Sequence, residues 1–137
     1  MTDAAYPVNS AVPRVAAAAP IVPVRDVDAS VGFYVSVLGF ESVFVAADRS
    51  TGEVCRDGAH IMFIACDDLD TLKVTATSMS IYMQVTNIDG LWQELSPRLG
   101  DLPRKQVRAP FNQPYGMREF HVKDPDGFLM LFGEPVE

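Results

Sequence analysis

Two residues of the first half combine a potential nucleophile with a potential base. Cys55 and His60 flank the dipeptide Asp57-Gly58. If that dipeptide is a two-residue hairpin turn, the thiol faces the imidazole on the neighbouring strand. A thiolate–imidazole pair can serve as a nucleophile with its base. No third group that would orient the imidazole is evident, so we favour the simpler interpretation of a small apolar residue beside a surface histidine.

Glu119 and His121 are the corresponding candidates in the second half. They stand two residues apart in a strand pattern, so their side chains share a face. Glu119 is a candidate general base in a cleft. It is equally a candidate ion-pair partner of Arg118 or of a neighbouring strand. These residues therefore do not identify a particular reaction.

These residues belong to two copies of one pattern. Residues 24–28 (VRDVD) match residues 85–89 (VTNID) at an offset of 61, and the offset persists to Leu38-Gly39 and Leu99-Gly100. Each copy follows an apolar run and opens a helical pattern of buried positions. The chain is therefore an internal repeat of two modules.

A polar residue and a glycine delimit each predicted helix. Asp26 and Asn87 are suitable N-caps, because their side chains can accept a hydrogen bond from a free amide of the first turn. Gly39 and Gly100 predict where the helices end. Pro97 interrupts the second apolar stripe, so we expect that helix to be short or irregular at its end.

Strand patterns follow each helix. In the first half they cover residues 40–47, 53–56 and 60–66, and in the second half residues 116–123 and 128–132 flank Asp124-Pro125-Asp126-Gly127. Proline presets this turn and glycine takes its left-handed position. Gly58 and Gly127, the turn glycines, are offset by 69 residues. Each half therefore reads as one strand, one helix and three strands.

Two such βαβββ modules side by side, with strands curved around a shared cleft, would bury both apolar sheet faces and make an α+β protein. We expect residues 1–19 to be an arm with little structure, or a strand that packs on a partner subunit. Residues 20–134 would form one domain. Its first module covers about 20–66, a polar linker about 67–77, and the second module about 78–134.

Composition excludes several classes of protein. The 137 residues are 48% hydrophobic and carry a net charge of −7. A nucleic-acid binder needs a basic face, and a membrane helix needs roughly 20 apolar residues in a row; the sequence has neither. Cys55 and Cys66 fall on strands in positions unsuited to a bridge. We therefore expect a cytoplasmic protein.

Several motifs resemble those of one superfamily. Residues 33–40 (FYVSVLGF) resemble the helix-to-strand signature of the glyoxalase, bleomycin-resistance and extradiol-dioxygenase proteins, also called vicinal oxygen chelate proteins. Residues 124–127 (DPDG) resemble their closing hairpin, and the similarity runs from about Pro20 to Phe132. Pro20 and residues 113–120 resemble the bleomycin-resistance branch most closely, although Met117 stands where the best-known binder is expected to have no residue. This resemblance implies a homodimer with two drug-binding grooves at the subunit interface.

The resemblance also indicates where a metal would bind. Metal-dependent relatives take ligands from the first and last strands of each module, and the matching positions hold Ala19, Met62, Ser80 and Leu131. None of these side chains is a ligand that a divalent ion requires. We therefore predict no metal and no cofactor. A register slip of two residues would bring His60 toward a ligand position, and an enzyme would then depend on His60, Glu119 and His121.

Aromatic side chains are the predicted ligand contacts. Phe44, Tyr82 and Tyr115 match aromatic positions of bleomycin-binding relatives. Phe111 and Asn112 would line the same loop as Tyr115, and Met117 would add an adaptable contact. Core packing and ligand contact are equally supported for Phe44, whereas Trp92 lies on the helical stripe and is assigned to the core.

These observations favour a metal-free, dimeric protein that sequesters an aromatic or cationic, antibiotic-like compound without breaking a bond. Stacking and cation–π contacts would hold the compound. The alternative is a metal-dependent lyase, isomerase or dioxygenase of the same superfamily. A third interpretation is an interaction module whose apolar groove holds a protein segment.

Overall fold

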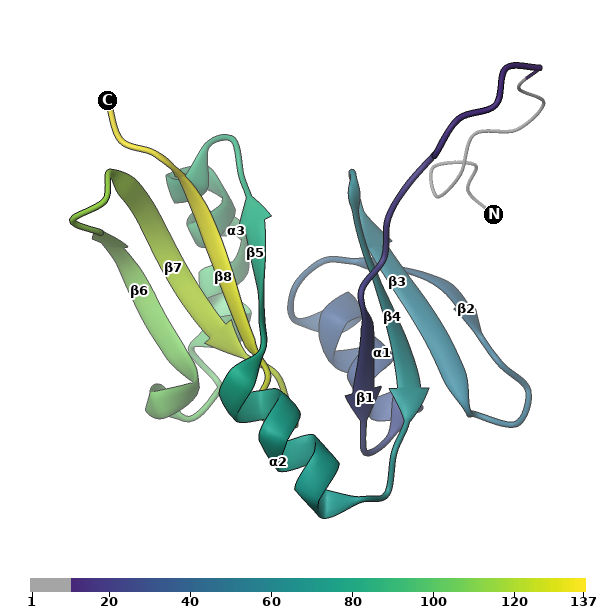
Figure 1. Ribbon diagram of the computed structural model, residues 1–137. Coiled ribbons are helices and arrows are strands. Elements are labelled where there is room, and N and C mark those ends of the chain that lie inside the picture. The colour runs from purple at the N-terminus through teal and green to yellow at the C-terminus, as the bar shows by residue number, and fades with distance from the viewer. Residues whose placement is uncertain (1–10) are drawn as a thin grey trace. The chain divides into compact units, whose positions relative to one another are not determined.

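The computed structural model describes residues 11–137, which divide into two compact units. The first unit runs to Asp67 and the second begins at Asp68 (Figure 1). Of the predicted arm, residues 1–10 lie outside the described part, and residues 11–19 form no helix or strand. Within the described residues, no helix is long and apolar enough to cross a membrane.

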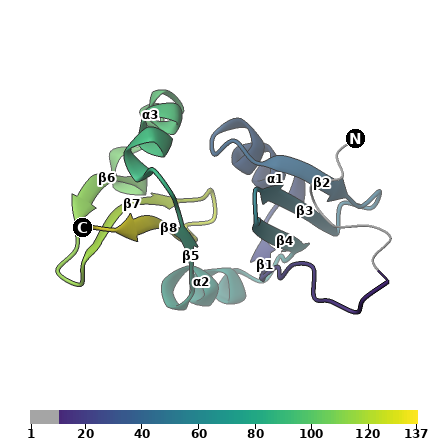
Figure 2. The same cartoon turned by 90° about the horizontal axis from the view of Figure 1, so that it is seen from above.

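The first unit is a four-stranded sheet with one helix. Its elements are β1 (Ile21–Val24), α1 (Val27–Ser36), β2 (Glu41–Val45), β3 (Thr51–Arg56) and β4 (Ala59–Ala65). The strand order is β1-β4-β3-β2, and β1 runs parallel to β4 while the other pairs are antiparallel. Helix α1 covers one face of the sheet (Figure 2).

Local sequence explains how α1 forms and where it packs. The Asp26 carboxylate accepts a hydrogen bond of 3.1 Å from the Ala29 amide and caps the helix. The chain turns toward β2 at Gly39, whose φ of 74° favours glycine. Gly52 on β3 lets the helix approach closely, because a Cβ there would lie 2.9 Å from Cγ1 of Val27.

The second unit repeats this arrangement and adds a helix. It contains α2 (Leu69–Ser78), β5 (Ser80–Gln84), α3 (Ile88–Leu99), the 3-10 turn η1 (Arg104–Gln106), β6 (Val107–Asn112), β7 (Met117–Lys123) and β8 (Leu129–Pro135). The strand order is β5-β8-β7-β6, with β5 parallel to β8. Each unit therefore has the predicted βαβββ order, and the predicted α+β fold is confirmed.

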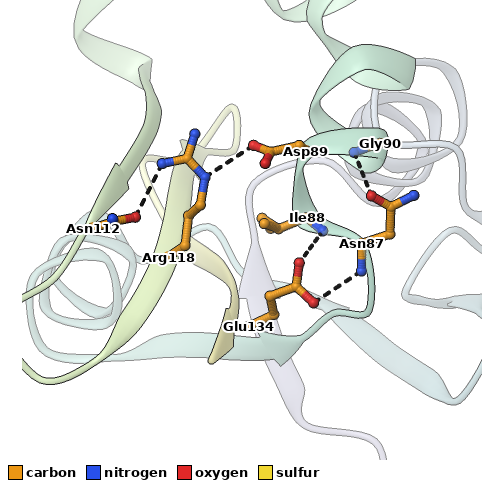
Figure 3. A network of polar contacts seen from close by, with 7 residues as sticks. All are labelled: Asn87, Ile88, Asp89, Gly90, Asn112, Arg118 and Glu134. Atoms are coloured by element: carbon orange, nitrogen blue, oxygen red, sulfur yellow. Dashed lines mark hydrogen bonds and ion pairs between the residues drawn. The ribbon is translucent and has the colours of Figure 1, made fainter. Parts of the chain in front are cut away.

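A carboxylate of β8 caps α3 (Figure 3). Glu134 accepts hydrogen bonds from the amides of Ile88, at 2.7 Å, and Asn87, at 3.1 Å. The Asn87 side chain accepts a further bond of 3.1 Å from the Gly90 amide, as predicted for an N-cap. Free amides and the helix dipole both favour a negative charge at this end. These contacts hold the start of α3 against the C-terminal end of the inner strand β8.

Two details of the helices differ from the sequence predictions. The predicted linker contains α2, because Asp68 caps a helix whose Leu72 and Thr75 are buried. Acidic residues interpreted as linker are thus the first turn of a helix, where they are favourable. Helix α3 continues through Pro97 to Leu99. Proline removes one i→i−4 hydrogen bond, and the helix ends two residues after Pro97.

Candidate functional site

Strand β7 presents two different faces. Phe120 faces α3, since its ring lies 5.2 Å from the ring of Trp92, and it is fully buried. Because strand side chains alternate, Glu119 and His121 point to the opposite side of the sheet. We call this side of the second unit the open face, meaning the sheet face that α3 does not cover.

The carboxylate of Glu119 is the centre of a hydrogen-bond cluster on the open face. Its Oε2 accepts bonds from the hydroxyls of Tyr82, at 2.8 Å, and Tyr115, at 2.6 Å. Its Oε1 accepts bonds from Nε2 of His121, at 2.8 Å, and Nε2 of Gln113, at 3.1 Å. Glu119 is 0% exposed. Four donors therefore satisfy both oxygens of a buried charge, which is the condition for keeping one inside a fold.

The cluster determines the protonation of its members. Burial alone would raise the pKa of Glu119, but the four hydrogen bonds outweigh it and lower the pKa to about 2. Burial and the bond to the carboxylate raise the pKa of Tyr82 to about 12. The pKa of Tyr115 also rises, chiefly because its hydroxyl donates to Glu119. Near neutral pH the centre is a carboxylate held by two protonated phenols.

A glycine on β8 gives Tyr82 access to Glu119. Gly133 is the ladder partner of Glu119 and is buried. A Cβ at this position would overlap the Tyr82 hydroxyl and would lie 3.0 Å from Cγ of Glu119. A side chain on residue 133 would therefore push the phenol away from the carboxylate, so the glycine is part of the site.

The tyrosine rings remain open to solvent although their hydroxyls are tied down. Tyr82 is 40% exposed and Tyr115 is 62% exposed. Each ring is fixed at its hydroxyl end by the same buried carboxylate. The cluster thus holds two aromatic surfaces in set orientations, which lowers the entropy lost when a ligand orders them.

Two residues that were predicted to lie on one loop belong to strand β6, and their side chains point to opposite faces of the sheet. Phe111 and Asn112 are the last residues of β6, so the predicted loop is wrong for both. Phe111 is the ladder partner of Glu119, and its ring meets that of His121 edge-on at 5.2 Å. Asn112 is the ladder partner of Arg118 and accepts a hydrogen bond of 3.1 Å from it. Phe111 therefore joins the open face, whereas Asn112 points to the α3 side (Figure 3).

The remaining predicted contacts lie elsewhere. Phe44 belongs to β2 of the first unit and is 40% exposed, so it is not a core residue. Met117 begins β7, shares the side of Glu119 by alternation, and is half-buried. Arg118 bonds to Asp89 at 3.0 Å and by strand alternation points away from the side of Glu119, so the alternative of a pairing between Arg118 and Glu119 is wrong. Trp92 packs on Phe120, as assigned, but is only half-buried.

The first unit holds a separate buried pair. Nδ1 of His60 lies 3.0 Å from Oε2 of Glu53, and both residues are at most 5% exposed. The surface position predicted for His60 is therefore wrong, and Glu53 is the orienting group that was not evident in the sequence. Cys55 is the ladder partner of His60, as the turn predicted. Burial raises the pKa of its thiol, and the nearby carboxylates of Glu41, Glu53 and Asp57 raise it further. A thiol with a raised pKa is a poor nucleophile, which argues against a thiolate–imidazole pair.

A family model described as the Glyoxalase/Bleomycin resistance protein/Dioxygenase superfamily matches residues 13–132. The chain belongs to this superfamily. No curated protein matches it in sequence.

Several solved structures resemble this chain over nearly its whole length. A bleomycin-binding protein from bleomycin-producing Streptomyces verticillus, complexed with copper(II)-bleomycin, is 25% identical; the match covers 92% of this chain and 99% of that one, with a TM-score of 0.68. TnmS3, an antibiotic binding protein from Streptomyces sp. CB03234, is 22% identical over 93% and 99%, with a TM-score of 0.65. A glyoxalase-related enzyme from Clostridium phytofermentans is 17% identical over 93% and 100%, with a TM-score of 0.64. The last two likenesses show the fold alone.

The strand register locates two of the positions at which the resemblance predicted metal ligands in related proteins. Met62 pairs with Glu53 and Ile21, while Leu131 pairs with His121 and Tyr82. Among residues 11–137, no three His, Cys, Asp or Glu side chains gather in a way that could hold an ion. The two histidines lie in different units, and each bonds a glutamate of its own unit.

Sequence reasoning missed three residues of the open face. Gln113 was noted only as part of a motif, and neither Gly133 nor Arg108 was identified. A glycine in an otherwise apolar strand often marks a close approach, which was a usable signal for Gly133. Pro110 lies within a strand, which was a signal for an irregular ladder. That irregularity determines the side of the sheet to which Arg108 points.

Proposed function

We propose that this superfamily member binds an aromatic, antibiotic-like small molecule and sequesters it without breaking a bond. The observation that carries the proposal is the fixed pair of exposed rings, Tyr82 and Tyr115, anchored to one buried carboxylate. Tyrosines offer large, rigid contact areas at little entropic cost, which suits them to binding surfaces. The likeness to a bleomycin-binding protein supports the same conclusion.

The protonation states favour binding over acid–base chemistry at this centre. A general base works best when its pKa lies near the working pH and its lone pairs can reach a substrate proton. Glu119 has a pKa of about 2, and four donors occupy its oxygens. Tyr82, with a pKa of about 12, keeps its proton. The cluster is therefore built to hold rings in place.

We further propose that the binder is metal-free, cytoplasmic and homodimeric, with the ligand groove at the subunit interface. Neither Cys55 nor Cys66 forms a disulfide bond, which suits a reducing compartment. Phe44, another predicted ligand contact, is 40% exposed. The resemblance to bleomycin-resistance proteins is the source of the dimer proposal.

Native mass spectrometry without added metal tests the assembly. We expect a dimer that carries no divalent ion. One divalent ion per subunit would contradict the proposal and favour the metal-dependent enzyme, with His60, Glu119 and His121 as the first residues to mutate. A monomer would contradict the dimeric groove.

Fluorescence titration tests the binding surface. The probes are three anthracene derivatives with the same ring and a different charge: 9-anthracenecarboxylate, its neutral carboxamide, and cationic 9-(aminomethyl)anthracene. We expect the tightest of them to bind in the micromolar range, and the double variant Tyr82→Ala, Tyr115→Ala to weaken it by about tenfold or more. Leu69→Ala, on an α2 residue that is 63% exposed, is the control and should change nothing. Equal affinity in the wild type and the double variant would refute the tyrosine surface.

A further inference from the structure

We propose that Arg108 makes the open face selective for aromatic compounds that carry a carboxylate or a similar planar anionic group. This inference rests on the aromatic-binding function proposed above and names its substrate class. It also narrows one expectation, since the sequence analysis predicted an aromatic or cationic ligand. Four features of β6 and the open face lead to it.

An irregular ladder brings Arg108 to the open face. Residues 108 and 111 are three apart, so in a regular strand their side chains would point to opposite sides. Here Arg108 pairs with His121 and Phe111 pairs with Glu119, so the two residues between them face only Phe120. Such bulges re-aim side chains. Arg108 and Phe111 therefore share the side of the sheet that carries the tyrosine cluster.

A chain of contacts links the guanidinium of Arg108 to the buried carboxylate. Its Cζ lies 3.5 Å from the centroid of the Phe111 ring, a cation–π contact. That ring meets His121 edge-on at 5.2 Å, and Nε2 of His121 donates to Glu119 at 2.8 Å. A stacked guanidinium loses less entropy when it binds a ligand than a mobile one does.

The donors of Arg108 are not used by another side chain. Within residues 11–137, Arg49 pairs with Asp28 and Arg118 with Asp89, but no carboxylate pairs with Arg108. Arg108 is exposed and its planar fork matches a carboxylate in a bidentate manner. Its hydrogen-bonding capacity is available to a bound molecule.

The open face carries no acidic group that would oppose an anion. On β7, Glu119 is buried with both oxygens occupied, and Lys123 is exposed. The residues that share this side on β5 and β8 are all uncharged: Ser80, Tyr82, Gln84, Leu129, Leu131, Gly133 and Pro135. The net charge of −7 thus arises elsewhere, and the exposed charged residues of the sheet on this side, Arg108 and Lys123, are basic.

Charge-matched variants test the assignment with the anthracene probes. Arg108→Gln removes the guanidinium, and Arg108→Lys keeps the charge but loses the planar fork. Arg104→Gln is the matched control, because Arg104 is an exposed arginine of η1 and its substitution changes the net charge equally. In the wild type we expect 9-anthracenecarboxylate to bind about tenfold more tightly than its carboxamide.

The ratio of the two affinities is the decisive readout. Arg108→Gln should bring this ratio close to one by weakening binding of the carboxylate far more than binding of the carboxamide, whereas Arg104→Gln should keep the wild-type ratio. Arg108→Lys should keep only part of it. The inference about Arg108 would be overturned by a ratio near one in the wild type or by tighter binding of the cationic probe. It would also be overturned if Arg108→Gln and Arg104→Gln reduced the ratio equally. In each of these cases the proposed function stands as long as binding still depends on the tyrosines. Failure of every probe to bind would overturn the proposed function itself.

Discussion

Substituting glutamine for Glu119 tests whether the buried carboxylate holds the tyrosine cluster as a charged group. The variant keeps the size of the side chain and removes its charge. The pKa of Glu119 is lowered from 4.5 to about 2 in the folded protein, because its four hydrogen bonds outweigh burial, which acts in the opposite direction. This difference corresponds to about 3 kcal/mol of the free energy of unfolding at neutral pH.

The sign of the pH dependence follows from the direction of the shift. A carboxyl whose pKa is lowered on folding stabilises the protein above its unfolded pKa, and this stabilisation is lost as the pH falls through the folded pKa. With values of 4.5 and about 2, the wild type loses about 2 kcal/mol of this contribution by pH 3. The glutamine variant has no such group to protonate. The wild type should therefore be more stable than the variant by about 3 kcal/mol at pH 7 and by only about 1 kcal/mol at pH 3.

Urea unfolding between pH 3 and pH 7 measures this difference. Trp92, the single tryptophan, packs on Phe120 of β7, so its fluorescence reports on the unit that contains the cluster. Glu41→Gln is the matched control, since Glu41 is an exposed glutamate of β2. It should show little pH-dependent change. If Glu119→Gln lowers the free energy of unfolding by the same amount at pH 3 as at pH 7, the proposal that Glu119 acts as a charged group is wrong. An equal pH-dependent change in the control variant would contradict it as well.

Three further substitutions follow from the local geometry. Gly133→Ala should weaken binding of the tightest anthracene probe in the titration above, because the new methyl would displace the Tyr82 hydroxyl from Glu119; an unchanged affinity would show that this contact does not position the ring. Gly32→Ala should raise the free energy of unfolding by roughly 0.5–1 kcal/mol in urea titration, because nothing lies within 4 Å of the added Cβ on an exposed helix position; a loss of stability would contradict this. Asp68→Ala should cost about 1 kcal/mol of unfolding free energy in the same assay by removing the cap of α2, and no change would mean that the cap contributes nothing.

Most of the fold was predictable because the repeat constrains it twice. The capping residues Asp26 and Asn87 correctly predicted where both helices begin. The turn at Asp57-Gly58 correctly predicted the pairing of Cys55 with His60. Helix α2 escaped prediction because it has no counterpart in the first half and because acidic residues are common in both linkers and first turns. A helix that occurs in one copy only carries no signal in an internal comparison.

The site was only partly predictable because hydrogen bonds between distant strands leave little trace in the sequence. Tyr82 and Tyr115 were identified as aromatic contacts, and the structure brings them together. That both hydroxyls meet on Glu119 depends on the pairing of β5, β7 and β8, and on the space left by Gly133. The place of Arg108 depends on a bulge, which strand alternation alone predicts wrongly.

The two halves share a backbone frame but not the chemistry placed on it. Ile21 pairs with Met62 as Tyr82 pairs with Leu131, which reproduces the offsets of 61 and 69 found in the sequence. In the first unit the exposed residue at this position is an isoleucine, and in the second it is the tyrosine that reaches the carboxylate. One position of the repeated frame therefore offers an apolar surface in one unit and an anchored aromatic ring in the other.

The glutamate–histidine pairs have diverged further. Glu53 on β3 faces Met62, and His121 on β7 faces Leu131, so by register these two residues occupy equivalent positions. Glu53 bonds to His60 on the neighbouring strand, whereas His121 bonds to Glu119, two residues earlier on its own strand. The pairs are therefore not copies of one ancestral dyad, as a repeated catalytic site would require. In the second unit Glu119 also accepts hydrogen bonds from the hydroxyls of Tyr82 and Tyr115, so the repeated frame carries a different polar cluster in each half.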